Sequence, residues 1–354
     1  MPEESLFCCT NFSALSLCYN PCMQNEQKRI LFINFGGLGD EILFLPSIIS
    51  VKKEFPNSKI TLALEPRSKG ICSLTNIIDE TLFADIKGKN KYFELLKLLF
   101  KIWTKSFDIV VCSGSNKFIA LFLFLTFIKK RYGYNSGKLS EIVLTKAIPL
   151  KKEQYAVNMY HDLVNEITQN KTELPQINIT RREVVPNTVL IHPGVSLMSV
   201  KKGMIKTIPA NIWAEVVEKL ADSGKKVILA GGPDDKETID TIIKNVPQEK
   251  YTNMYGKTKN LTELAELISS AEIFLCSDSA PLHIGVALGV QTYVIFGSTD
   301  NKKLIPQSEK VIPIKAKNCN CPLQPCLWER RQTTCESLDC LKISSDEIVE
   351  KICG

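Results

Sequence analysis

A glycine-rich turn followed by a carboxylate is the first feature of the sequence that could do chemistry. Gly36, Gly37, Gly39 and Asp40 (GGLGD) directly follow the apolar run ILFINF. Glycines let backbone amides approach a ligand, and the N-terminus of a following helix favours negative charge. The turn is not the dinucleotide fingerprint G-x-G-x-x-G, because Asp40 replaces its last glycine and would repel a pyrophosphate. Asp40 is therefore either a helix N-cap or a base at the mouth of a cleft.

A second candidate lies at the end of the apolar run TVLIH. His192 closes this run and is followed by Pro-Gly and by a lysine-rich loop that contains Lys201, Lys202 and Lys206. Lysines beyond the carboxyl end of a strand can clamp a phosphate. A solvated basic loop has the same composition, so both interpretations stay open.

A third candidate is the segment SDSAPLH, which contains Asp278, Ser279, Ala280 and His283. A predicted strand ends there in a carboxylate and hydroxyls, and the next helix begins with a proline in its first turn. This arrangement directs small donors and a helix N-terminus toward an anion. His283 lies one turn inside that helix, where a histidine taken singly is also compatible with an ordinary core position.

Alternating strands and helices must position these segments. Continuous apolar runs predict strands at 30–35, 59–64, 107–112, 188–192, 225–230, 272–276 and 292–296. Helical spacing falls between them, at 41–54, 92–104, 118–128, 156–168, 211–222, 235–244, 261–269 and 281–288. Such strands are typical of parallel sheets covered on both faces. The fold class is therefore α/β, with two doubly wound, Rossmann-like domains and a site between them at the carboxyl ends of the strands.

Composition sets limits on the class of protein. The chain has 354 residues, 44% hydrophobic and 23% charged, which fits two soluble domains and excludes a coiled coil or a collagen. We expect a disordered appendage at 1–28, an N-terminal domain at 29–175, a C-terminal domain at 176–316, and a cysteine-rich segment with a helix at 317–354. The net charge of +6 suits an anionic substrate or an acidic membrane surface, and no nucleic acid is expected.

The thirteen cysteines do not form the pattern of a small secreted domain, so a cytoplasmic location is expected. The longest apolar run, 118–128, is too short to span a membrane. It is followed by Lys129, Lys130 and Arg131. We expect a helix that faces the core of the first domain, and the alternative is peripheral contact with the inner membrane.

The order of GGLGD, HPG, the lysine loop, AGGPDD, SDSAPLH and FGSTD resembles glycosyltransferase family 9, the heptosyltransferases of lipopolysaccharide core assembly. The resemblance spans residues 30 to about 345. It implies the GT-B fold, in which the N-terminal domain at 29–175 binds the acceptor and the C-terminal domain at 176–316 binds the nucleotide sugar. The implied enzyme is inverting and metal-independent and has no cofactor. The implied partners are an ADP-heptose donor and a lipid-linked or core saccharide acceptor. The alternatives are a protein heptosyltransferase of the autotransporter type and a GT-B nucleotide-sugar epimerase.

The resemblance also implies roles for individual residues. Asp40 matches the catalytic base, and the glycines of its turn match substrate-binding positions. Lys206 matches the lysine that grips the donor diphosphate, although Lys201 or Lys202 could take this part because the usual Lys-x-Trp-Pro is KTIP here. The other matching positions are Asp235 for the ribose, the segment 258–261 with Lys259 for the adenine, Asp278 for the sugar hydroxyls, and Ser279 and Ala280 for the phosphates, with His192 and His283 close by.

A cysteine cluster near the C-terminus leaves two possibilities open. Five thiols, Cys319, Cys321, Cys326, Cys335 and Cys340, would suffice for a zinc or iron site. Their spacing is not the paired C-x2-C of a zinc ribbon, and the resemblance implies that ordinary family 9 members also carry cysteines here. We therefore expect free thiols, with a metal site as the alternative.

Overall fold

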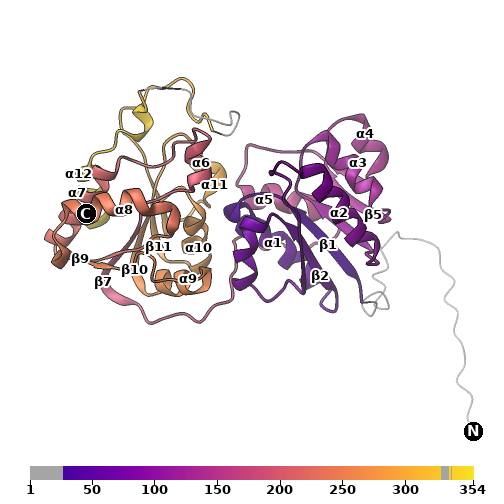
Figure 1. Cartoon of the computed structure of the whole chain (residues 1–354), viewed down its shortest axis with the longest axis horizontal. Coiled ribbons are helices and arrows are strands. Elements are labelled where there is room, and N and C mark those ends of the chain that lie inside the picture. The colour runs from indigo at the N-terminus through magenta and orange to yellow at the C-terminus, as the bar shows by residue number, and fades with distance from the viewer. Residues whose placement is uncertain (1–26, 328–334, 336) are drawn as a thin grey trace, which may run out of the picture.

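The computed structural model describes residues 27–327, 335 and 337–354. Two α/β domains lie side by side, each built on a six-stranded parallel sheet (Figure 1). All but the last two residues of the predicted appendage 1–28 lie outside the described part of the chain. The predicted α/β class with two Rossmann-like domains is thus confirmed.

The first sheet has the strand order β3-β2-β1-β4-β5-β6. Its strands are β1 (Arg29–Asn34), β2 (Lys59–Leu64), β3 (Glu80–Phe83), β4 (Ile109–Cys112), β5 (Lys130–Tyr134) and β6 (Lys146–Ile148). Its helices are α1 (Leu38–Glu54), α2 (Lys91–Trp103), α3 (Lys117–Leu125), α4 (Lys138–Val143) and α5 (Ala156–His161), with 3₁₀ turns at Pro66–Ser73 and Asp162–Val164.

The alternation of side chains along β1 divides this domain into two layers. Ile30 and Phe32 pack against α1 and α5 in one core, whereas Leu31 and Ile33 pack against α2 and α3 in another. Successive residues of a strand point to opposite faces, so an uninterrupted apolar run is needed when both faces are covered. In Figure 1, α2, α3 and α4 lie on the side of this domain that is away from the second domain.

The second sheet has the strand order β12-β11-β10-β7-β8-β9. Its strands are β7 (Val185–His192), β8 (Lys226–Leu229), β9 (Tyr251–Asn253), β10 (Ala271–Ser277), β11 (Gln291–Ile295) and β12 (Val311–Ile314). Its helices are α6 (Leu197–Lys201), α7 (Ala210–Asp222), α8 (Lys236–Asn245), α9 (Leu261–Ser269), α10 (Ala280–Leu288), α11 (Asn301–Leu304) and α12 (Ser345–Cys353), with 3₁₀ turns at Pro233–Asp235, Gln248–Lys250 and Asp339–Leu341.

A stretch without helix or strand, 165–184, connects the two sheets. The predicted division at residue 175 falls within it and stays a prediction, as do the other domain limits. The helix expected over 156–168 is shorter, because α5 ends at His161 and continues only as a 3₁₀ turn.

The helix expected to face the core over 118–128 does so only in part. In α3, Ala120, Phe122 and Leu123 are buried, while Phe118 is 66% exposed and Phe124 is 44% exposed. The expected core-facing helix is therefore present, and its outer face, with Phe118 and Phe124, is exposed. Parallel sheets do need cover, but one face of a helix provides it.

The two domains touch on either side of the interdomain space. The Thr262 hydroxyl donates a hydrogen bond to the Ser73 carbonyl at 2.9 Å. Lys303 Nζ lies 3.1 Å from Glu153 Oε1. Between these contacts α1 packs directly against α10, so the N-termini of the two helices meet at the carboxyl ends of both sheets.

Candidate active site

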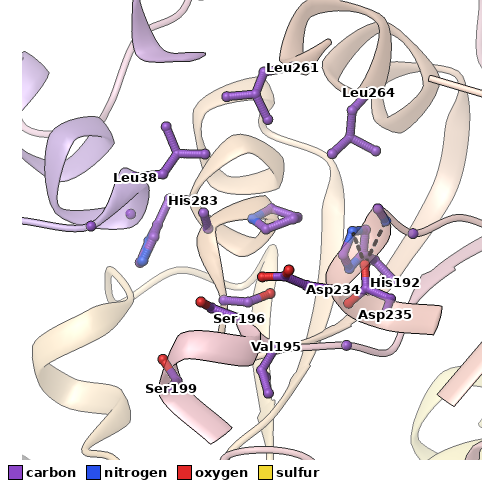
Figure 2. Close-up of a pocket in the computed structure, with 18 of the residues that line it drawn as sticks. Leu38, His192, Val195, Ser196, Ser199, Asp234, Asp235, Leu261, Leu264 and His283 are labelled. Atoms are coloured by element: carbon purple, nitrogen blue, oxygen red, sulfur yellow. Dashed lines mark hydrogen bonds and ion pairs between the residues drawn. The ribbon is translucent and has the colours of Figure 1, made fainter. Parts of the chain in front are cut away.

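A cavity of about 790 Å³ lies between the domains and is lined by both of them. From the first domain come the residues of the α1 N-terminus and Arg67; from the second come loops after β7, β8 and β10. Figure 2 shows His192, Asp234, Asp235 and His283 around this space, with Leu38 approaching from the other domain. The cavity thus brings together most of the residues that the sequence singled out.

Asp40 stands in the first turn of α1 with an exposed side chain. Its Oδ2 accepts a hydrogen bond from the Gly37 amide at 2.7 Å, and its Oδ1 accepts one from the Tyr160 hydroxyl at 3.2 Å. Gly36 must lack a side chain, because a Cβ there would lie 2.3 Å from the Asp40 Cβ. The N-cap position belongs to Gly37 rather than to Asp40, so the carboxylate is fixed by two donors and still faces the cavity.

Glu41 is the next residue of α1, and its environment is the opposite. Its side chain is 1% exposed, and neither carboxyl oxygen has a hydrogen-bond partner among the described residues. Burial first, and the Asp40 carboxylate second, raise the pKa of Glu41 well above its usual range. The uncharged acid is therefore favoured at this position, beside an Asp40 that is open to solvent.

Lys206 and Asp278 form an ion pair in the second domain. Lys206 Nζ donates to Asp278 Oδ2 at 3.0 Å, and the Thr299 hydroxyl donates to the same oxygen at 2.8 Å. Burial alone would raise the pKa of Asp278, but Lys206 and these hydrogen bonds outweigh it and lower the pKa. An ammonium has three donors, so Lys206 can hold Asp278 and still present donors to an anion in the cavity.

His283 connects the two halves of the site. Burial lowers its pKa to about 4, although the carboxylates of Asp278 and Asp40 act in the opposite direction. Its Nδ1 has no hydrogen-bond partner among the described residues. Gly39 is needed beside the ring, because a Cβ at residue 39 would lie 3.0 Å from the His283 Cδ2. His283 therefore presents a neutral imidazole where the domains meet.

Asp235 lines the cavity but directs its carboxylate into its own loop. Its Oδ2 accepts from the Gly232 amide at 2.6 Å and lies 3.5 Å from His192 Nε2. A Cβ at Gly194 would collide with its Oδ1 at 1.5 Å. Burial raises the pKa of Asp235. These contacts make Asp235 an organiser of the loop after β8, and its contact with a ribose stays a prediction.

The remaining predicted residues divide into two groups. Gly37, Lys259, Ser279 and Ala280 line the cavity. Gly36, Lys201 and Lys202 do not line it. Lys201 and Lys202 lie at the end of the short helix α6, which carries them away from the pair of Lys206 and Asp278. Of the three candidate lysines, Lys206 is therefore the one at the site.

Two residues of the site were missed by the sequence analysis. Tyr160 donates to Asp40 from α5, and nothing in its spacing distinguishes it from a core aromatic residue. Arg67 lines the cavity after β2, with Nη2 3.5 Å from the Gly36 carbonyl oxygen. Arg67 could have been predicted, because it is a basic residue just beyond the carboxyl end of the predicted strand 59–64.

The five C-terminal cysteines lie near one another. Burial first, and then the thiols of the other four, raise the pKa of Cys340 to about 12. Cys319, Cys321, Cys335 and Cys340 are free thiols in the structure. Among the described residues, no group of three or more His, Cys, Asp or Glu side chains is arranged to hold a metal ion. The metal alternative therefore gains no support from their arrangement.

Comparison with known proteins identifies the class. The model of glycosyltransferase family 9 (heptosyltransferase) matches residues 95–332. The chain belongs to this family and is a glycosyltransferase, and no helix of its described residues has the length and apolarity to cross a membrane.

Individual relatives cover nearly the whole chain. Lipopolysaccharide heptosyltransferase 3 of Escherichia coli (strain K12) is 24% identical over 301 residues, which are 79% of this chain and 86% of the relative. A family 9 glycosyl transferase from Veillonella parvula superposes with a TM-score of 0.73 at 21% identity and covers 91% of this chain and 95% of its own. ADP-heptose lipopolysaccharide heptosyltransferase II of E. coli gives 0.69 at 20% identity, with coverage of 92% and 97%. The predicted GT-B fold is confirmed by these structures.

Proposed function

We propose that the protein transfers a heptose from ADP-heptose to a saccharide of the lipopolysaccharide core, with inversion at the anomeric carbon. The observation that carries the proposal is the position of Asp40, which faces the pair of Lys206 and Asp278 across one cavity between the domains. A displacement reaction needs a base on the acceptor side and positive charge on the leaving group. The names of the relatives supply the sugar and the acceptor class.

In the proposed reaction, Asp40 takes the proton of the acceptor hydroxyl while the hydroxyl oxygen attacks the anomeric carbon. The bond between that carbon and the diphosphate oxygen breaks on the opposite side, and ADP leaves with the electron pair. Lys206 and the N-terminus of α10 stabilise the charge that develops on the diphosphate. Asp278, held by Lys206 and Thr299, accepts hydrogen bonds from the sugar hydroxyls.

The surroundings of Asp40 support its role as the base. Glu41, its neighbour in α1, is buried and favours its uncharged form, so Glu41 adds little negative charge beside the proposed base. Arg67 adds positive charge on the acceptor side of the cavity, which suits an anionic saccharide. A lipid-linked acceptor would place the enzyme at the cytoplasmic face of the inner membrane.

The test is a transfer assay with ADP-heptose, UDP-sugars and GDP-sugars, on a lipopolysaccharide acceptor and on a protein acceptor. We expect ADP-heptose and the saccharide acceptor to be preferred. Asp40→Asn should lower kcat about 100-fold or more and leave donor affinity nearly unchanged. Asp240→Asn is the control, because Asp240 belongs to a surface ion pair on α8. A kcat of Asp40→Asn within about threefold of the wild type would refute the assignment.

A further inference from the structure

The outer face of the first domain carries an apolar surface that the transferase reaction does not use. Every exposed aromatic side chain of the described residues lies between residues 83 and 127. We call the exposed apolar side chains of α2 and α3 the outer apolar face. Its members are Tyr92, Phe93, Leu96, Phe100 and Trp103 on α2, Phe118, Leu121, Phe124 and Leu125 on α3, and Phe127 just after α3. Exposed apolar patches of this extent mark an interaction site.

Helical spacing gathers these side chains into one stripe on α2. Residues 92, 96, 100 and 103 follow one another at intervals of three or four, and they lie next to the buried Leu98, Leu99 and Ile102 on the helix surface. An ordinary surface helix has one apolar stripe, directed to the core. The apolar face of α2 is wider than that, and the domain covers only part of it.

Trp103 joins the stripe of α2 to that of α3. Its Nε1 donates to the Leu125 carbonyl at 2.8 Å, and its ring centroid lies 6.0 Å from that of Phe127 and 5.1 Å from that of Phe100. The polar atom of the indole is thereby satisfied within the protein. The two stripes thus form one continuous and ordered surface.

The charge around this surface is strongly positive. Residues 87–146 contain twelve Lys and Arg against three Asp and Glu, a surplus of nine that exceeds the surplus of six of the whole chain. Cations also border the aromatic rings: Lys91 Nζ lies 4.9 Å from the centroid of Tyr92, and Lys117 Nζ lies 5.6 Å from that of Phe118. Aromatic side chains bordered by lysines suit the boundary between acyl chains and anionic headgroups.

A second cavity, of about 900 Å³, opens at one end of the surface. Its lining combines the rings of Trp103 and Phe127 with Asp108 and the lysines at positions 28, 105, 129 and 130, of which Lys105 is paired with Glu80. Apolar walls and ammonium groups together match a headgroup phosphate with the start of its acyl chains.

One end of the outer apolar face lies at the edge of the sheet that carries the active site. The helices α2 and α3 begin after the carboxyl ends of β3 and β4, and in a parallel sheet these ends share the edge at which β1 leads to Asp40. The 13 residues of α2 extend about 20 Å from that edge. The starts of both helices, with Tyr92, Phe93 and Phe118, therefore lie at the sheet edge that carries the site, whereas Trp103 and Phe127 lie toward the opposite edge.

We propose that the outer apolar face is a docking site for the surface of an anionic lipid bilayer. A second copy of the chain fits it less well, because two identical faces would bring like charges together. This proposal depends on the proposed function in one respect: a lipid-linked acceptor would reach the enzyme at the membrane. Binding to lipid and transfer of sugar are measured separately.

The experiment is co-sedimentation of the full chain with vesicles of phosphatidylethanolamine and phosphatidylglycerol, and with phosphatidylcholine vesicles, at low and high salt. The apolar variant is F93S/L96S/F118S and the charge variant is K101E/K129E. The matched control is I243S/K244E, which changes an exposed isoleucine and lysine on α8 of the second domain. Melting temperatures show that the variants are folded.

We expect the wild type and the control to bind the anionic vesicles, and the apolar variant to bind at least about tenfold more weakly at either salt concentration. The charge variant should lose the preference for anionic vesicles, and high salt should reduce that preference in the wild type. All of these proteins should transfer sugar equally to a lipid-free acceptor. Loss of that transfer with vesicle binding intact would overturn the proposed function but not the docking site.

Two results would overturn the docking site. One is equal binding of the wild type and both variants to vesicles, or no binding at all. The other is self-association: if light scattering shows an oligomer that the apolar variant abolishes, and vesicles bind no protein, the face is an interface between copies of the chain.

Discussion

His283 should stay uncharged far below the pH at which an exposed histidine takes up a proton. Its ring is buried, and burial lowers its pKa from the usual 6.5 to about 4. Between these two values the unfolded chain binds more protons at this residue than the folded chain does. The stability that His283 contributes is therefore present above pH 6.5 and is lost as the pH falls toward 4. The complete difference corresponds to about 3 kcal/mol, of which about 2 kcal/mol falls between pH 7 and pH 5.

The magnitude is measured with the wild type and His283→Gln, whose free energies of unfolding are compared at pH 7 and pH 5. The wild type should lose about 2 kcal/mol more than the variant on acidification, because all other titrating groups cancel in the comparison. The chain has three histidines, so histidine resonances in NMR can be assigned with single variants. The resonance of His283 should then show no titration above about pH 5.

A titration midpoint of His283 near 6.5 would refute the reasoning, as would an identical pH dependence of unfolding in both proteins. Either result would mean that the ring is hydrated or is held as an imidazolium by Asp278. The neutral imidazole would then be lost at the place where the two domains meet, and the packing of Gly39 against the ring would have to be looser than the structure indicates.

Three further predictions concern the first domain. Tyr160→Phe removes the hydrogen bond that positions Asp40, so it should lower kcat about tenfold and leave the donor KM unchanged. An altered donor KM with unchanged kcat would show that Tyr160 does not position the base. Glu41→Gln should stabilise the fold, and the gain should grow as the pH rises above 4.5, by up to about 1.4 kcal/mol per pH unit. The reason is that the raised pKa of Glu41 makes the wild type lose stability in that range. Equal melting temperatures of the two proteins at pH 5 and at pH 8 would disprove this prediction. Gly39→Ala should lower the melting temperature, because the added Cβ would lie 3.0 Å from the buried ring of His283 and this crowding outweighs the gain in helix propensity. The same change should slow transfer, and an unchanged melting temperature with unimpaired transfer would show that the close contact is not needed.

The strands and helices buried on both faces were predictable, and the edges of the sheets were not. The run KITLAL predicts 59–64, and β2 has those limits; the helix predicted at 261–269 is α9. The strands β3, β5, β6, β9 and β12 were missed. They have only three to five residues, and their pairing depends on a neighbouring strand that the local sequence does not reveal.

The position of the site was predictable because ligands of parallel sheets bind at the carboxyl ends of the strands. The partners of its side chains were not. Lys206 and Asp278 are 72 residues apart, and their ion pair depends on how the loop after β7 folds over β10. For Asp235 the sequence predicted a contact with the ligand. In the structure its carboxylate is instead directed into the protein, where it lies against glycines 194 and 231 and accepts a hydrogen bond from the Gly232 amide.

The division of the site between two domains has a consequence for how such an enzyme changes in evolution. On the proposed assignment, the first domain holds the base and the acceptor, and Lys206 and Asp278 of the second hold the donor. A substitution around Arg67 can therefore alter which saccharide is accepted without disturbing the nucleotide sugar, and a substitution around Lys259 can do the opposite. Donor and acceptor preference are then separately heritable properties of one chain. A first domain exchanged with that of a relative should bring its acceptor with it, provided that the packing of α1 against α10, with Gly39 against His283, is kept.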